Sequence, residues 1–198
     1  MDLTSLKAKE VKCMLDNSKC EVIGTHPMFG PCKNFKKQTI AICPGRGEKW
    51  LPILKKILKN ENAIIQEISP KEHDKQMAIV QGLTHFSSIA IGAAIGNLTT
   101  DVYETLKLAS PIYKLRMSSL GRILNQDANL YADIELLNPQ IKKTVKELQN
   151  NVNKLAEIIE TGDKKKFIEF FDKTSKKLGN YPEIAEKESN KIIELMKQ

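Results

Sequence analysis

The sequence has few aromatic residues and few arginines. Aromatic residues make up 6% of its 198 positions, and only three of its 31 basic residues are Arg, at Arg46, Arg116 and Arg122. A nucleic-acid-binding protein usually shows a basic stripe with aromatic residues interleaved, whereas the lysines here are spread along the chain. The net charge of +7 therefore predicts weak, non-specific attraction of anions and argues against a nucleic-acid partner.

Recognised metal, redox and phosphate motifs are also missing. The four cysteines, Cys13, Cys20, Cys32 and Cys43, form no C-x-x-C pair. The sequence does not open with a secretory signal pattern, so we expect free thiols in a cytoplasmic protein and no metal site. No G-x-G-x-x-G loop, P-loop, nucleophile elbow or H-E-x-x-H helix is present. These motifs therefore assign no reaction class.

Charged residues are absent from Gln76 to Thr100, a stretch long enough to span a bilayer. It also contains Gly92 and Gly96 at the spacing of packed membrane helices. Several polar residues inside the stretch would each need a partner in lipid: Gln81, Thr84, His85, Ser87, Ser88 and Asn97. We therefore expect a helix buried on most sides of a soluble core, with a two-fold partner supplying further cover.

Residues 1–69 read as alternating helix and strand. Apolar residues at helical spacing occupy 5–15 and 50–58. Short β-prone runs bounded by turn signals occupy 21–24, 38–43 and 63–68. Three strands and two helices correspond to half of a doubly wound α/β unit.

The composition changes at Ser69-Pro70. Ser69 and Glu72 form a capping box, and Pro70 occupies the first helical position. No strand signal recurs after this point. Helices are predicted at 70–98, 101–108, 110–125, 127–137, 139–160, 163–178 and 181–197. The sequence therefore predicts an α/β domain over 1–69 followed by an all-α domain over 70–198.

Three histidines are candidates for chemistry. His26 follows a predicted strand, in a loop from Gly24 to Pro31, at the sheet edge where α/β folds bind ligands. Spacing alone leaves open whether its imidazole is positioned for a ligand or faces solvent. His85, midway along the uncharged helix, is either a core residue or faces a cleft. His73 is expected to be a partly exposed residue at a helix start.

Arg122 is unusual because nearly all basic residues of this chain are Lys. Its guanidinium could bind a carboxylate through two parallel hydrogen bonds, which an ammonium cannot do. A surface ion pair is the alternative.

Several short segments carry a further signal when they are taken in order. They are Asp2-Leu3-Thr4-Ser5-Leu6-Lys7, Gly24 to Pro31, His73 to Phe86, Ser110-Pro111-Ile112-Tyr113, Gly121 to Asp127 and Leu130-Tyr131-Ala132-Asp133-Ile134. In this combination they resemble the prephenate dehydrogenase family, most of all the form fused to chorismate mutase in some bacteria. The resemblance covers the whole chain.

The resemblance implies a fold, a reaction and partners. The fold is the second half of a Rossmann-type dinucleotide-binding domain over 1–69, followed by a helical dimerisation domain over 70–198. The family oxidatively decarboxylates prephenate to 4-hydroxyphenylpyruvate in tyrosine biosynthesis, with NAD or NADP as cofactor. A cytoplasmic homodimer is implied, with tyrosine as a feedback inhibitor and with no nucleic-acid or membrane partner.

The resemblance also implies roles for named residues. His26 would accept the proton of the ring hydroxyl, and Ser5 would orient His26. Arg122 would bind a substrate carboxylate, and His85 and Tyr131 would line the substrate pocket. Further implied contacts are Gln126, Lys7 and Lys114 for the substrate and Ser5, Lys7 and Pro27 for the cofactor. Lys114 stands where close relatives have Arg.

The family's glycine-rich strand–turn–helix, which holds the cofactor pyrophosphate, does not occur in this sequence. We therefore expect a fragment of the active enzyme, a sheet with an unpaired edge and poor turnover of prephenate by this chain alone. The alternative is a non-catalytic dimeric module that binds tyrosine or a related aromatic acid.

Overall fold

The computed structural model describes residues 1–30, 32–98 and 101–196. Pro31 of the predicted loop, Thr100 of the uncharged stretch and Lys197 of the last predicted helix lie outside the described residues. The chain divides into two compact units. The first contains residues 1–84 and 129–144, and the second contains residues 85–128 and the chain from Val145 onward.

The first unit is built on a sheet in the order β1-β2-β3. Its strands are β1 (Val22–Pro27), β2 (Thr39–Arg46) and β3 (Ile64–Glu67), which overlap the three predicted runs. Strand β1 continues through Pro27, so residues 24–27 of the predicted loop belong to the strand. Strand β2 runs antiparallel to β1, because no helix separates them, and parallel to β3, because α2 (Trp50–Asn60) provides the crossover. Strand β1 pairs only with β2 among the described residues, so it has one unpaired edge.

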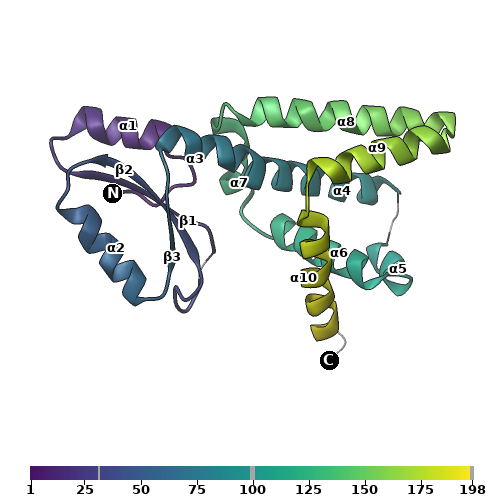
Figure 1. Ribbon diagram of the computed structural model, residues 1–198, viewed down its shortest axis with the longest axis horizontal. Coiled ribbons are helices and arrows are strands. Elements are labelled where there is room, and N and C mark those ends of the chain that lie inside the picture. Colours follow the sequence, from purple (N-terminus) through teal and green to yellow (C-terminus); the bar gives the residue numbers. More distant parts are fainter. Residues whose placement is uncertain (31, 99–100, 197–198) are drawn as a thin grey trace. The chain divides into compact units, whose positions relative to one another are not determined.

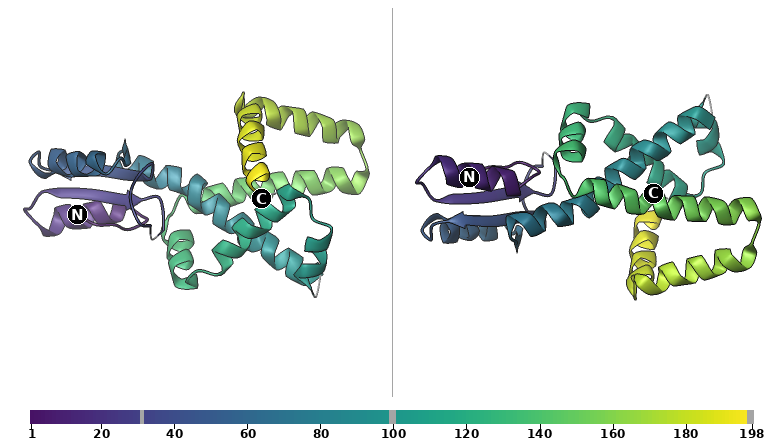
Figure 2. Two further views of the ribbon diagram at one scale, coloured as in Figure 1. Left: turned by 90° about the horizontal axis from the view of Figure 1, so that it is seen from below. Right: turned by 90° about the horizontal axis from the view of Figure 1, so that it is seen from above.

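Helices α1 (Ala8–Asn17) and α2 cover opposite faces of this sheet (Figure 2). On the α2 face, Leu58 packs with Ile23, Ile40 and Ile42. The α1 face has its own core of Val11, Val22 and Cys43. Each fully buried aliphatic side chain contributes about 1.5–3 kcal/mol. The two small cores therefore fix the sheet and, with it, the position of β1.

A continuous helical run begins at the predicted cap, where the side chain of Ser69 accepts the backbone N–H of Glu72. It comprises α3 (Pro70–Met77), a π-helical turn (Ala78–Leu83) and α4 (Thr84–Leu98) (Figure 1). By length and composition alone the run could cross a membrane, and 11% of its most apolar 18-residue window is buried. The expectation that the uncharged helix is buried on most sides of one chain is wrong, since no residue of α4 is buried.

The segment around α7 (Ala128–Leu137) belongs to the same unit as the sheet. Asn138 Nδ2 donates a 2.7 Å hydrogen bond to the carbonyl of Asp74, and Thr144 Oγ1 donates one of 3.1 Å to the carbonyl of Ala78. These contacts explain why the compact unit extends past the predicted boundary at 69/70 and includes residues 129–144.

The second unit contains α4, α5 (Val102–Lys107), α6 (Pro111–Leu124), most of α8 (Ile141–Thr161), α9 (Lys164–Lys177) and α10 (Tyr181–Leu195). Gly92 of α4 faces Leu120 and Leu124 of α6. After a turn at Gly162, whose φ is +64°, α9 runs back along the direction from which α8 came (Figure 1).

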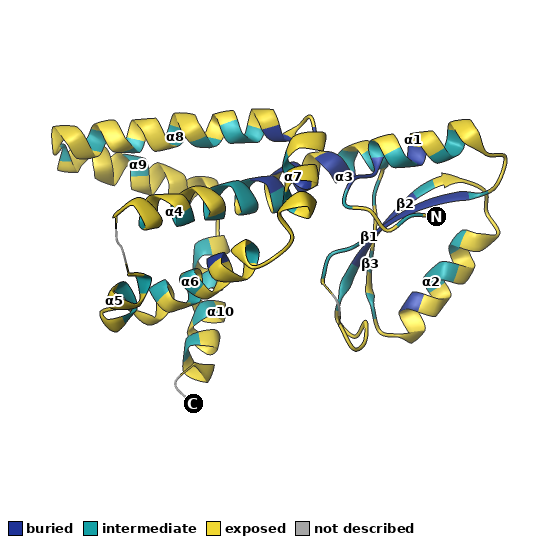
Figure 3. Ribbon diagram, turned by 180° about the vertical axis from the view of Figure 1, so that it is seen from behind, coloured by how far each residue is buried: buried dark blue, intermediate teal, exposed yellow. Residues whose placement is uncertain are grey.

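Much of the surface of α8, α9 and α10 is exposed (Figure 3). Large apolar side chains in this unit are exposed as well: Ile89, Val152, Ile159, Phe167, Ile168, Phe171, Ile184 and Ile192.

Candidate active site

Strand β1 carries His26 into the interior of the first unit. The residue is 4% exposed, and its backbone lies opposite Ala41 of β2. Its Nδ1 lies 3.0 Å from Nε2 of His73. The two rings meet edge to face, with an interplanar angle of 65°. The solvent-facing alternative for His26 is therefore wrong.

His73 was expected to be partly exposed, and this expectation is also wrong. The residue is 1% exposed, because α3 packs against α1 and β2. Nδ1 of His73 lies 2.8 Å from Oδ1 of Asp74. A chain of hydrogen bonds thus runs from Asp74 through His73 to His26. The His-Asp pair in the segment that begins at His73 was the one signal in the sequence that could have revealed it.

Asp74 is fixed by backbone groups as well. Its Oδ1 accepts the N–H of Lys7 at 2.8 Å, and its Oδ2 accepts the N–H of Ala8 at 2.9 Å. The carboxylate therefore caps the start of α1 while it binds His73. Burial by itself would raise the pKa of Asp74, but the hydrogen bonds from His73 and from the two backbone groups outweigh it and lower that pKa.

Lys7 has no exposed surface. Its ammonium pairs with the carboxylate of Asp2 and donates to Thr4 Oγ1 at 3.0 Å and to the carbonyl of Thr25 at 2.8 Å. The three N–H donors of this ammonium are thus used in contacts that hold β1 in place. In this arrangement no N–H group of the Lys7 ammonium is left over for the predicted contacts with substrate and cofactor.

The environment of His26 keeps its imidazole neutral. Burial lowers the pKa of His26 to about 4, and the nearby His73 and Lys7 act in the same direction. At neutral pH the ring can therefore accept a proton. In the part of the chain that the structure describes, the hydrogen bond to His73 occupies Nδ1, and Nε2 makes none.

Ser5 lines a pocket of about 310 Å³ within the same unit. The other lining residues are Leu3, Thr4, Leu6, Glu10, Leu130, Asp133, Ile134 and Leu137. Tyr131 lies half-buried on α7, the helix that forms one wall of this pocket. Within the described ranges no hydrogen bond joins Ser5 to His26, so the orienting contact observed for His26 comes from His73.

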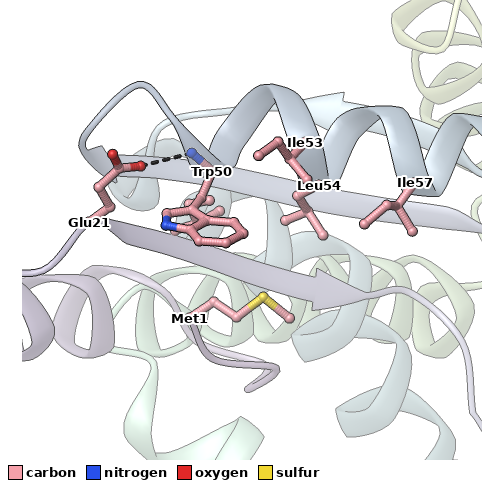
Figure 4. A pocket seen from close by; sticks show the side chains of 7 residues that line it. Met1, Glu21, Trp50, Ile53, Leu54 and Ile57 are labelled. Atoms are coloured by element: carbon pink, nitrogen blue, oxygen red, sulfur yellow. Dashed lines mark hydrogen bonds between the residues drawn. The ribbon is translucent and has the colours of Figure 1, made fainter.

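A second pocket, of about 300 Å³, lies between β1 and α2 (Figure 4). Its walls are largely apolar and contain no predicted site residue: Met1, Glu21, Ile23, Trp50, Ile53, Leu54 and Ile57. Glu21 accepts the backbone N–H groups of Lys49 and Trp50 at 3.2 and 2.9 Å. This carboxylate occupies the start of α2, as Asp74 occupies the start of α1.

A dinucleotide pyrophosphate usually binds the free N–H groups at the start of a helix next to the sheet. At α1 and α2 carboxylates already accept these groups. The described residues therefore do not fit the pyrophosphate of NAD or NADP at either helix. Pro27, at the end of β1, is half-buried.

The remaining predicted contacts belong to the second unit. Lys114 and Arg122 are exposed on α6, and Gln126 is exposed in the turn after it. His85 is half-buried near the start of α4, and burial lowers its pKa. These residues belong to the second unit, whereas His26 belongs to the first.

Two family models match the chain in succession. One is described as "Prephenate dehydrogenase, nucleotide-binding domain" and matches residues 1–67. The other is described as "Prephenate dehydrogenase, dimerization domain" and matches residues 69–173.

Curated relatives point to the same group of enzymes. A "Probable arogenate/prephenate dehydrogenase" of Methanocaldococcus jannaschii is 39% identical over 186 residues, which cover 91% of this chain and 42% of the relative. A "T-protein" of Haemophilus influenzae is 32% identical over 194 residues, 98% of this chain and 52% of the relative. The chain thus spans about half the length of the curated relatives it matches.

Solved structures share the fold at low sequence identity. The prephenate dehydrogenase of Aquifex aeolicus, in complex with hydroxyphenyl propionate and NAD+, is 21% identical with a TM-score of 0.70; the match covers 87% of this chain and 63% of that one. A putative prephenate dehydrogenase of Corynebacterium glutamicum is 19% identical with a TM-score of 0.72, and the match covers 91% of this chain and 61% of that one. These likenesses show that the chain has the same fold.

Proposed function

Because the chain belongs to the prephenate dehydrogenase family, we propose that it takes part in the oxidative decarboxylation of prephenate to 4-hydroxyphenylpyruvate. The observation that carries the proposal is the neutral, buried imidazole of His26, held at Nδ1 by His73. An imidazole that is neutral at pH 7 is suited to accept a proton from a substrate hydroxyl.

The proposed reaction uses His26 as the proton acceptor. NAD or NADP, with Ser5 and Pro27 as proposed contacts, would supply the acceptor for the hydride on the hydroxyl-bearing ring carbon. The hydroxyl proton passes to Nε2 of His26. The carboxylate on the opposite ring carbon leaves as carbon dioxide, its bonding electrons complete the aromatic ring, and the phenolate oxygen recovers a proton. General-base assistance of this kind contributes roughly 10²–10⁴-fold to a rate.

Residues of the second unit are proposed to bind the substrate. Arg122 would hold a carboxylate through its planar guanidinium, with Lys114, Gln126 and His85 as further contacts. Tyr131 and Ser5, from the first unit, would line the pocket, and tyrosine would inhibit by occupying it. Ser5 and Pro27 remain proposed contacts of the cofactor, while Lys7 is proposed as a support of β1 because its ammonium is fully engaged.

We further propose a cytoplasmic homodimer that does not cross a membrane. The matched dimerization-domain model and the exposed apolar side chains of α4, α8, α9 and α10 support association of two chains. Obligate interfaces resemble a protein core cut in half, and a partner chain would give α4 the cover that its own chain does not.

One observation favours a second candidate function, a dimeric module that binds tyrosine or a related aromatic acid. The carboxylate caps at α1 and α2 leave no pyrophosphate site at those helices. Calorimetric titration with tyrosine and with NAD distinguishes the two candidates. Tight binding of tyrosine without any binding of NAD by the full-length protein favours the module.

The proposed reaction is tested with the full-length protein, prephenate and NAD or NADP. Formation of 4-hydroxyphenylpyruvate together with reduced cofactor is the expected result. His26→Asn keeps the approximate size of the side chain but cannot take up the proton, so kcat should fall by about 10²–10⁴ while KM changes little. A raised KM with an unchanged kcat would contradict the role of His26, and a lack of turnover of prephenate and of arogenate would contradict the reaction.

A further inference from the structure

We propose that His73 is a positioning residue, which, held by Asp74, fixes His26 in the tautomer that carries its proton on Nδ1 and presents a bare Nε2. The identity of the substrate rests on the proposed function, but the tautomer rests only on the contacts among these three residues.

The direction of the hydrogen bonds starts at Asp74. Its carboxylate is held at 2.8 and 2.9 Å by the backbone N–H groups of Lys7 and Ala8, so it cannot turn away from the ring beside it. A carboxylate is only an acceptor. The 2.8 Å contact therefore places a proton on Nδ1 of His73. In a neutral His73 the other nitrogen, Nε2, is then an acceptor.

His26 completes the chain. Its Nδ1 lies 3.0 Å from the acceptor nitrogen of His73, so this nitrogen must carry the proton that forms the hydrogen bond. With Nδ1 protonated, a neutral His26 has a lone pair on Nε2. Free histidine prefers the opposite tautomer, so the one required here must be imposed by its partner.

Burial of both rings favours this tautomer of His26 over the other. His26 is 4% exposed and His73 is 1% exposed, so water cannot readily replace either ring as a hydrogen-bond partner. A buried polar nitrogen without a hydrogen-bond partner is destabilising. With Nδ1 of His73 protonated toward Asp74, the other tautomer of His26 would place two lone pairs against each other across the 3.0 Å contact.

The tautomer determines what His26 can do. A bare Nε2 can accept a hydroxyl proton, whereas a protonated Nε2 could only donate. His73 should therefore affect kcat more than substrate binding, although it touches neither substrate nor cofactor in the proposed scheme.

The decisive measurement is the tautomer of His26 in the protein labelled with ¹⁵N-histidine. Long-range ¹H–¹⁵N correlation spectra at pH 8 distinguish a protonated Nδ1 from a protonated Nε2, and His26→Gln assigns the signals. The expected result is a proton on Nδ1 of His26 in the wild-type protein. A proton on Nε2 would overturn the proposal, whether or not any variant folds.

Two substitutions at the same position provide the matched comparison. His73→Phe fills the space but offers no acceptor, so the signals of His26 should shift toward the tautomer with Nε2 protonated. His73→Gln keeps a side-chain oxygen that can accept, so it should retain the wild-type tautomer. An unchanged tautomer in a folded His73→Phe protein would overturn the proposal, and the signals of His85 serve as the internal reference.

Turnover by the full-length protein provides the second readout. In His73→Phe, kcat should fall about 10-fold or more, which is less than the roughly 10²–10⁴-fold contribution of the base itself. KM should stay within about 2-fold, and His73→Gln should restore most of the rate. A proton on Nδ1 without any turnover of prephenate would contradict the proposed function alone. Turnover with a proton on Nε2 would contradict the positioning role alone.

Discussion

The ammonium of Lys7 donates a 2.8 Å hydrogen bond to the carbonyl of Thr25, the residue directly before His26. The same ammonium pairs with Asp2 and has no exposed surface. Lys7 therefore ties the segment before α1 to the part of β1 that carries the imidazole.

Replacing Lys7 tests this supporting role. Lys7→Met keeps most of the side-chain volume but removes the cation that pairs with the Asp2 carboxylate and the donor to the Thr25 carbonyl. We expect a loss of about 1–3 kcal/mol in the free energy of unfolding, since a partly buried carboxylate loses its cation and a buried carbonyl loses a donor. Lys9→Met, at an exposed position of α1, should change stability by less than about 0.5 kcal/mol. Equal effects of the two substitutions in denaturant unfolding would show that Lys7 provides no such support.

The contact between β1 and α1 at Gly24 leaves no room for a side chain. A Cβ atom at Gly24 would lie 2.6 Å from Cγ2 of Val11. Gly24→Ala should therefore destabilise the protein by about 1–3 kcal/mol. Val11→Ala removes the opposing methyl groups, so the double variant should lose less stability than the sum of the two single variants. Additive losses in thermal unfolding would contradict the clash.

The lowered pKa of His26 predicts a pH-dependent stability. The folded value is about 4 and the usual value is 6.5, so the unfolded chain binds the proton more readily between these two values. Stability should therefore be complete above pH 6.5 and should fall by about 3 kcal/mol as the pH drops toward 4. His26→Gln should flatten this part of the profile in urea unfolding experiments. A wild-type profile that is already flat between pH 6.5 and 4 would contradict the burial of the neutral ring.

Arg122 is expected to act on substrate binding. Arg122→Gln removes a charge-assisted contact that exists in both the ground state and the transition state, so KM should rise while kcat changes little. An unpaired substrate carboxylate makes the expected loss roughly 2–5 kcal/mol. Arg116→Gln, at another exposed position of α6, is the matched control and should leave KM within about 2-fold. An equal rise of KM in both variants would indicate a general charge effect rather than a specific contact.

The exposed apolar helices predict association of two chains. Light scattering without detergent should give the mass of a dimer at micromolar concentration. Ile89→Lys on α4 should weaken the dimer, whereas Ile64→Lys on β3, at a residue of similar exposure (45% against 40%), should not. A stable monomer would contradict the dimer, and extraction only with detergent would favour a membrane-spanning helix over 70–98.

Local signals in the sequence determined most of the secondary structure. The start of α3 is predicted from the capping residue Ser69 and from the proline that follows it, and the structure has both this cap and the helix. The strands β1, β2 and β3 likewise follow from short β-prone runs bounded by turns. These features depend on neighbouring residues alone, so a single sequence contains the information for them. The motifs at Gly24–Pro31 and at His73 also identified His26 and the family.

Only the tertiary structure decided how the candidate site is assembled. His26 and His73 are separated by 47 positions, and Lys7 and Asp74 by 67, yet hydrogen bonds join each pair. The pattern around His73 is equally compatible with an exposed helix start, and it becomes buried because α3 packs against α1 and β2. The burial of Lys7 likewise depends on residues from other parts of the chain. Burial and hydrogen-bond partners depend on which surfaces of the protein meet, and no local sequence pattern specifies this. The sequence therefore identified His26 as a candidate. The packing of α1, α3 and the sheet determined the hydrogen-bond partner of its imidazole, its neutral state and its orientation.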